Sequence, residues 1–251
     1  RKLSLTEAGQ VLFEQVVPAF GRIDNAIEML NRFRVAPTGT VRLNMPRVIA
    51  AHVLLPKLQA FQQHYSDIRL EIAAENRFAD IVGEGFDAGI RLGKHLERDM
   101  VAVRITPDIK IAVVGSPDYF ACHPKPKTPQ DLHLHQCINR RTITNGGIEN
   151  WVFEQHHQTF SIEVSGGLIL DDADLIVDAA VQGLGLAYSA EELVTQQLEE
   201  GKLIQVLSEY SPSIPGFFLY YSDRRISAAL RALVDTLRVD ESALDSLRED
   251  F

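Results

Sequence analysis

The sequence predicts an α/β protein in which a long amphipathic helix precedes two units of similar construction. Two observations support this prediction. Apolar residues recur at spacings of three and four over residues 12–33, and from residue 41 onward short alternating strands are separated by helices. This strand–helix–strand rhythm favours a mostly parallel sheet in each unit.

The N-terminal helix has a start signal, an internal proline and a stop signal. Ser4-Leu5-Thr6-Glu7 fits a capping box, with Thr6 as a competing N-cap, and the Pro and Gly of residues 36–40 end the pattern. Pro18 predicts a kink or a division into two helices. A lone helix with this apolar stripe would expose it to water, so we expect residues 1–36 to pair with a second copy; the alternative is packing back on the same chain. The stripe residues expected at the dimer contact are Leu12, Val16, Phe20, Ile23, Ile27 and Leu30.

The first unit is expected to run from residue 41 to about 108. Pro46 suits the first turn of a helix over residues 48–65. Gly85 is expected to end a short helix over residues 78–84. Alternating apolar residues predict strands at 41–45, 68–72, 88–92 and 101–105.

The second unit, residues 109–222, is richer in turns. Thr128 followed by Pro129 predicts a helix start, and Asp171 and Asp172 are expected to cap a helix that runs to about residue 182. A further helix is expected at 191–199. The predicted strands lie at 109–114, 136–140, 151–154, 159–164, 168–170, 186–188, 202–207 and 217–221.

A last amphipathic helix at 227–239 needs a partner. If it returns to the first unit, the two units share two crossing strands, which would form a hinge. The expected domains are then 1–36 for the dimerisation helix, 41–108 with 223–239 for subdomain I, 109–222 for subdomain II, and 240–251 for an acidic tail.

The composition narrows the class of protein. Of the 251 residues, 45% are hydrophobic and 24% are charged, which excludes collagen-like and disordered chains. No apolar run approaches the roughly 20 residues that cross a bilayer. The net charge of −9 predicts no chain-wide basic surface for nucleic acid, although residues 1–42 carry +2, which leaves −11 for the remainder.

The N-terminus and the cysteines indicate the compartment. The first residues have no apolar core and no cleavage site, so a signal peptide is not expected. Cys122 and Cys137 are too few for a disulfide framework, and we expect reduced thiols in the cytoplasm. The missing initiator Met indicates a piece of a longer protein.

An ordered set of motifs resembles LysR-type transcriptional regulators. Residues 1–9 are similar to the end of the wing and the start of the linker helix in that family. The most specific block is Asp-Ile-Val-Gly-Glu-Gly-Phe-Asp-Ala-Gly-Ile-Arg-Leu-Gly at residues 80–93. Further blocks in the family's order are residues 54–56, 116–119, 128–132, 135–137, 179–187 and 201–203.

The resemblance implies an architecture and partners. Residues 1–36 would pair as linker helices, and residues 41–239 would form two Rossmann-like subdomains like those of type 2 periplasmic binding proteins. The implied partners are a small-molecule effector, with a carboxylate as one candidate, and further copies in a homodimer and a homotetramer. DNA would be bound only by a winged helix-turn-helix upstream of Arg1, and neither a membrane nor a cofactor is implied. A transporter's solute-binding protein explains the two α/β units equally well, but not residues 1–36.

The effector is expected in the cleft between the sheets, where two helix N-termini offer free N–H groups to an anion. Arg47 either holds an acidic effector or is a solvated arginine at a helix start, whereas Asp171 and Asp172 either cap their helix or favour a polar or basic effector. Arg91 either borders the cleft or pairs with Asp87. The predicted effector residues are Met45, Pro46, Arg47, Val48, Asn76, Arg77, Arg91, Gly93, Asp171, Asp172 and Phe218.

Catalytic and metal-binding motifs are not prominent. The sequence has no nucleophile elbow, P-loop or H-E-x-x-H motif, so we do not expect an enzyme. His133, His135, Cys137 and Cys122-His123 could supply zinc ligands, but their spacing matches no compact signature, and a histidine-rich surface loop is favoured. A redox pair of Cys122 and Cys137 would need disulfide geometry and an oxidising compartment.

Overall fold

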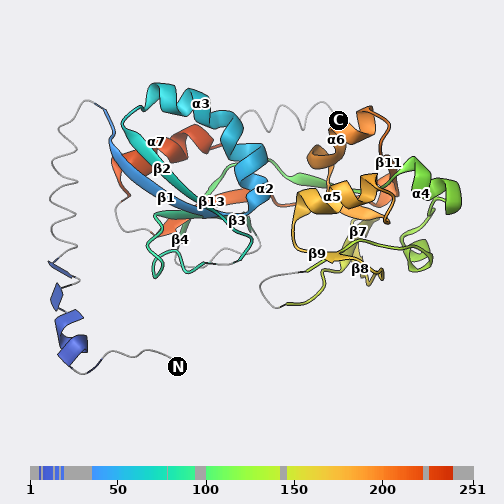
Figure 1. The fold of residues 1–251 in the computed structure, drawn as a ribbon, viewed down its shortest axis with the longest axis horizontal. Coiled ribbons are helices and arrows are strands. Elements are labelled where there is room, and N and C mark those ends of the chain that lie inside the picture. The colour runs from blue at the N-terminus through green and yellow to red at the C-terminus, as the bar shows by residue number, and fades with distance from the viewer. Residues whose placement is uncertain are drawn as a thin grey trace.

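The computed structural model describes residues 6, 8–13, 15, 16, 18, 19, 36–77, 79–93, 100–141, 146–222 and 226–239. Figure 1 shows two α/β bodies side by side, with extended segments running between them. The N-terminal residues 8–13 are helical, as predicted, and Leu12 and Val16 are exposed. Phe20, Ile23, Ile27 and Leu30 lie outside the described residues. Within the described ranges, no helix combines the length and apolarity needed to span a bilayer.

The first body is built on a five-stranded sheet with the order β2-β1-β3-β13-β4. β1 runs parallel to β2 and β3, whereas β13 is antiparallel to both of its neighbours. The predicted parallel sheet is therefore interrupted by one reversed strand. The strands are β1 (Gly39–Met45), β2 (Ile68–Ala74), β3 (Ala88–Leu92), β4 (Met100–Arg104) and β13 (Phe217–Ser222).

The helix after β1 is not a regular α-helix. Short α2 (Arg47–Ile49) leads into the π-helical η1 (Ala50–Leu54), which continues as α3 (Leu55–His64). The N–H of Leu55 donates to the carbonyl of Ala50, one residue further back than in an α-helix. Pro56 has no N–H to offer the carbonyl four residues earlier, and its ring would crowd that carbonyl, which accounts for the local widening.

The prediction of a short helix at residues 78–84 is wrong for the part of this segment that the structure describes. Residues 81–85 form a turn, in which the Asp80 carboxylate accepts the N–H of Gly83 at 2.9 Å. Glycine at 83 and 85 adds to the cost of a helix here. The chain instead reverses at Gly85, which has a φ of +73°.

The last helix returns to the first body. α7 (Ala228–Leu237) begins at Ser227, whose hydroxyl accepts the N–H of Leu230 at 3.1 Å. Its apolar face, including Leu230, Leu233 and Leu237, is buried with strand β1 in one core. The helix therefore packs with the first sheet, although it follows the second body in sequence.

The second body is organised around β5 (Ile109–Gly115), which is antiparallel to β10 (Ala187–Ala190), β11 (Ile204–Val206) and β12 (Ser213–Ile214). The prediction of a mostly parallel sheet is wrong for these pairs, because β5 enters from the other body against the direction of its neighbours. The helices are α4 (Pro117–Cys122), η3 (Pro129–Leu134), α5 (Ala173–Val181), α6 (Glu191–Glu199) and η4 (Ser208–Tyr210). The peripheral strands are β6 (Asn139–Arg140), β7 (Trp151–Gln155), β8 (Gln158–Ile162) and β9 (Ile169–Leu170).

Two segments, residues 105–108 and 215–216, join the bodies and lie against each other. The N–H of Ile105 donates to the carbonyl of Phe217 at 3.0 Å, and the N–H of Phe217 donates to the Thr106 hydroxyl at 2.8 Å. A Cβ at Gly216 would lie 2.1 Å from the carbonyl oxygen of Pro107. Only glycine therefore fits where the crossing segments pass.

Candidate functional site

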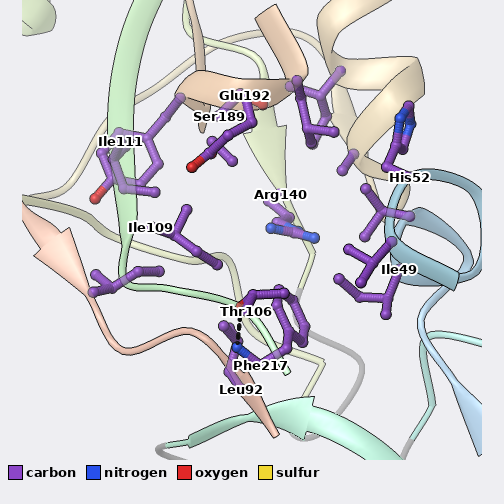
Figure 2. A pocket seen from close by; sticks show the side chains of 18 of the residues that line it. Ile49, His52, Leu92, Thr106, Ile109, Ile111, Arg140, Ser189, Glu192 and Phe217 are labelled. Atoms are coloured by element: carbon purple, nitrogen blue, oxygen red, sulfur yellow. Dashed lines mark hydrogen bonds between the residues drawn. The ribbon is translucent and has the colours of Figure 1, made fainter. Parts of the chain in front are cut away.

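A cavity of about 330 Å³ lies between the two bodies, beside the crossing segments. One wall comes from the helix after β1 and from the ends of β3 and β13; the other comes from β5, α5 and the β10–α6 corner. Figure 2 shows side chains from both walls facing a common space. Most of the lining is apolar and includes Ile49, Ile109, Ile111, Ile176, Leu193 and Phe217.

Arg140 and Glu149 form an ion pair on the wall of this cavity. The backbone N–H of Glu149 donates to the carbonyl of Arg140 at 2.9 Å, which holds the two residues side by side. Their charged groups are 4.0 Å apart, from Nη1 of Arg140 to Oε2 of Glu149. In Figure 2 the Arg140 guanidinium lies near the middle of the view. His52 on η1 and Glu192 on α6 lie farther from the middle.

A second group of charges links the two bodies at the edge of the cavity. Nε and Nη2 of Arg47 each lie 2.6 Å from an oxygen of Asp172, and Nη2 lies 2.5 Å from Asp174. Nε2 of His52 is 2.9 Å from the other oxygen of Asp174. We call Arg47, His52, Asp172 and Asp174 the Arg47 cluster. The hydrogen bonds from Arg47 hold the pKa of Asp172 below its usual range, and Asp172 in turn raises the pKa of Arg47.

Asp172 also caps its helix, as predicted. Its carboxylate accepts the N–H groups of Asp174 and Leu175 at 3.1 and 3.2 Å. The adjacent Asp171 contributes through its backbone carbonyl, which accepts a 2.9 Å hydrogen bond from Nδ2 of Asn76 on the other body. The predicted site residues Arg47, Asn76, Asp171 and Asp172 are thus brought together, and they contact one another across the cleft.

The residues predicted at the first helix start have different surroundings. Val48 lines the cavity. Met45 is fully buried in the core of the first body. Pro46 occupies the N-cap position, and its carbonyl accepts the N–H groups of Ile49 and Ala50.

The two other predicted arginines bind groups on their own body. Arg77 is paired with Glu75 and Glu84. Arg91 is buried and donates to the carbonyls of Ile90 and Arg77 and to the side chain of Asn44. Its burial lowers the pKa of Arg91. The Asp87 carboxylate, the alternative partner expected for Arg91, accepts the backbone N–H of Arg42 at 2.7 Å.

The cavity is lined by the immediate neighbours of two further predicted residues. Gly93 packs beneath the ring of Phe218, where an added Cβ would lie 2.8 Å from that ring. Leu92 and Phe217 are the residues that face the cavity. Because successive side chains of a strand point to opposite faces, a prediction displaced by one position selects the wrong face.

Sequence reasoning missed the Arg140–Glu149 pair. Arg140 ends the predicted strand 136–140, as Arg91 lies near the end of the predicted strand 88–92, so position at a strand end is the available signal for Arg140. No sequence signal indicates Glu149, whose backbone N–H and carboxylate meet Arg140 only in the folded chain.

Two histidines of this group, His123 and His135, contact Tyr119, whereas His133 and Cys122 are exposed. The prediction of a surface loop is wrong for His135, which is 5% exposed and whose Nδ1 is 3.1 Å from the Tyr119 hydroxyl. Tyr119 stacks on His123 with ring centroids 4.2 Å apart. Burial raises the pKa of Cys137 to about 12, whereas Cys122 is exposed. Within the described ranges, no three His, Cys, Asp or Glu side chains are grouped as metal ligands would be.

Comparison with known proteins assigns this architecture to a family. Residues 35–240 match the family model described as the LysR substrate binding domain. The chain belongs to the LysR family. It is the effector-binding part of a LysR-type transcriptional regulator, with the two-subdomain fold of type 2 periplasmic binding proteins.

Curated relatives of the LysR-type chain are transcriptional regulators. It is 41% identical over 239 residues to a putative transcriptional regulator of Pseudomonas aeruginosa, covering 95% of this chain and 78% of the relative. It is 37% identical to the HTH-type transcriptional regulator PgrR of Escherichia coli, with 95% and 80% covered. These matches favour a transcriptional regulator over the solute-binding protein of a transporter.

Solved structures share the fold. The full-length virulence activator AphB of Vibrio cholerae superposes with a TM-score of 0.73 at 25% identity, over 94% of this chain and 80% of AphB. CrgA of Neisseria meningitidis, at 24% identity, gives a TM-score of 0.72 over 94% of this chain and 80% of CrgA.

Proposed function

We propose that the chain senses a small molecule in the cavity between its subdomains and transmits the bound state to a DNA-binding domain. The supporting observation is that both bodies contribute walls to one cavity beside the crossing segments. A ligand that contacts both walls binds the closed arrangement more tightly than an open one. It shifts the equilibrium by that difference in affinity.

The Arg47 cluster acts in the same equilibrium. Arg47 and His52 belong to one body, whereas Asp172 and Asp174 belong to the other, so these contacts exist only while the cleft is closed at this edge. An acidic effector at Arg47 would have to displace two carboxylates. We therefore place a carboxylate effector group at Arg140, and we assign Arg47 to closure of the cleft.

The assembly follows the family plan. The exposed side chains of Val11, Leu12 and Phe13 support pairing of the N-terminal helix with a second copy in a homodimer, which then forms a tetramer. DNA contact belongs to the helix-turn-helix part of the regulator, and its place of action is the cytoplasm. We expect the two bodies to move as the two subdomains, with the predicted end of subdomain II at residue 222 moved back to residue 214, because β13 belongs to the sheet of the first body. The bound effector is released without chemical change.

A cavity-filling substitution tests the proposal. Val53 lines the cavity and is partly buried, so Val53→Trp fills the space that an effector would occupy. Leu55→Trp, on the same helical segment but 57% exposed, is the control. Each protein is incubated with a cell extract of metabolites below 1 kDa and analysed by native mass spectrometry. Wild type and Leu55→Trp should retain a ligand that Val53→Trp loses; equal retention by all three contradicts the proposal.

A further inference from the structure

Ser189 places a hydroxyl in the wall of the cavity, near the end of β10, and is only 7% exposed. Its hydroxyl has no hydrogen-bond partner among the described residues, and its oxygen retains accessible surface. In Figure 2 the Ser189 side chain points toward the space between the two walls. Because a buried hydroxyl without a partner is unfavourable, this one is positioned for a group that enters the cavity.

The helix that follows Ser189 begins at the same corner without a cap. α6 has nine residues, and its N-cap Ala190 has no side chain that could accept a hydrogen bond. The first N–H groups of a helix lack partners inside the helix, and no side chain of the described residues accepts those of α6. The start of α5, by contrast, is capped by Asp172. Ala190 and Leu193 line the cavity, so the free N–H groups of α6 lie at its wall.

We propose that the β10–α6 corner is a polar subsite that binds an uncharged carbonyl oxygen of the effector. This inference rests on the function proposed above and deepens it. The Ser189 hydroxyl and a backbone N–H at the start of α6 donate to that oxygen, whose two lone pairs accommodate both donors. The rest of the effector packs on the apolar lining, which is typical of small-molecule sites.

The other hydroxyl groups of the wall already have partners. The Thr106 hydroxyl accepts the N–H of Phe217 at 2.8 Å. The Tyr188 hydroxyl donates to the carbonyl of Val152 at 2.8 Å and accepts its N–H at 3.3 Å. Among the hydroxyl groups of the wall, the one of Ser189 is therefore available to a ligand.

The charged groups of the wall keep contact with water. The Arg140 and Glu149 side chains are 41% and 32% exposed, and Glu149 makes a further contact within the protein. Glu192 is exposed, and His52 is paired with Asp174. Water screens a contact between a ligand and any of these charges. The enclosed part of the wall is left with neutral donors.

The balance of charge favours an uncharged group at this corner. One positive charge, on Arg140, and two negative charges, on Glu149 and Glu192, leave the wall at −1 when histidine is neutral. Glu191 and Glu192 also occupy the first turn of α6, where they offset the positive end of the helix dipole, so an anion gains little there. A cation cannot accept the N–H groups. A carbonyl oxygen uses the donors without adding a charge.

Three compounds with one carbon skeleton test the subsite. Acetophenone carries a carbonyl, 1-phenylethylamine has an ammonium group in its place, and ethylbenzene has neither. Saturation-transfer NMR titrations on the full chain give a Kd for each compound. Acetophenone should bind wild type at least about fivefold more tightly than the amine, which leaves the donors unpaired. Equal or tighter binding of the amine overturns the proposal, as does failure of acetophenone to bind.

Two variants locate the donors. Ser189→Ala removes the hydroxyl, and Ala190→Asn supplies a side-chain oxygen that caps α6 and competes for its N–H groups. Each should weaken acetophenone relative to ethylbenzene by roughly fivefold, the size expected for one neutral hydrogen bond. Because a new cap stabilises a helix, Ala190→Asn is expected to fold. Ser161→Ala is the control and should leave the ratio unchanged, since Ser161 is exposed on β8 and is not part of the cavity wall.

The outcomes separate this subsite from the sensing function. An unchanged ratio of the two Kd values in either Ser189→Ala or Ala190→Asn overturns the proposal. If Val53→Trp loses a retained metabolite while that ratio does not depend on the corner, the sensing function stands and this inference falls. If the ratio changes as expected while Val53→Trp retains the same ligand as wild type, the subsite stands and the sensing function falls.

Discussion

At the scale of single residues, side-chain pairing decides which predicted site residues are open to a ligand. Sequence position selects Arg47 and Asp172 correctly as residues of the two helix starts that face each other. It does not show that they bind each other, because they are separated by 125 positions along the chain. The resulting cluster is partly exposed, with 47% of the Arg47 side chain accessible, so its contribution to folding stability is small. Its importance lies in the relative position of the two bodies.

Replacing Arg47 should change the titration of Asp172. The pKa of Asp172 is lowered in the folded protein, so the stabilisation is present above the unfolded pKa of about 3.9 and is lost as the pH falls through the folded value. Arg47→Gln should therefore raise the pKa of Asp172 and reduce the loss of stability in acid. NMR titration of the Asp172 carboxyl carbon measures this shift. Arg77→Gln is the control, since Arg77 is similarly exposed and pairs with Glu75 and Glu84; an equal shift in both variants would contradict the assignment.

At the scale of elements, predictions succeed where local pattern and tertiary packing agree. The strand at 88–92 and the helix at 191–199 are confirmed to the residue. The strand at 136–140 shortens to β6, and β12 was not predicted, because short strands depend on partners distant in sequence. The wall that carries Arg140 and Glu149 escaped prediction for the same reason.

The β7–β8 hairpin contains a two-residue turn without the Asn or Gly residues that usually predict one. His156 and His157 both have positive φ values, 51° and 62°, as a two-residue type I′ turn requires. Because a Cβ is unfavourable there, His157→Gly should stabilise the protein by about 0.5–1 kcal/mol. Urea unfolding measures the change. His157→Ala keeps the Cβ and should give no such gain; equal stabilisation by both variants would refute the backbone explanation.

At the scale of the whole molecule, the two bodies are held in register by their crossing segments. Gly216→Ala would place a methyl group against the carbonyl of Pro107, in a contact that requires backbone movement. We expect a destabilisation of about 1–3 kcal/mol, typical of overpacking, together with altered cleft closure. Thermal unfolding and small-angle scattering report the two effects. Gly167→Ala, where an added Cβ meets nothing within 4 Å, is the matched control and should change neither.

The strand order of the first sheet also affects how the protein is synthesised. β13 lies between β3 and β4, and among the described residues it is the strand that pairs with β4. A ribosome makes β4 more than 100 residues before it makes β13. Until then the nascent chain carries an unpaired strand and an open edge of β3, the kind of surface that recruits chaperones or aggregates. The second body, which is contiguous in sequence, can complete its sheet first, so the first body to be translated is the last to finish folding.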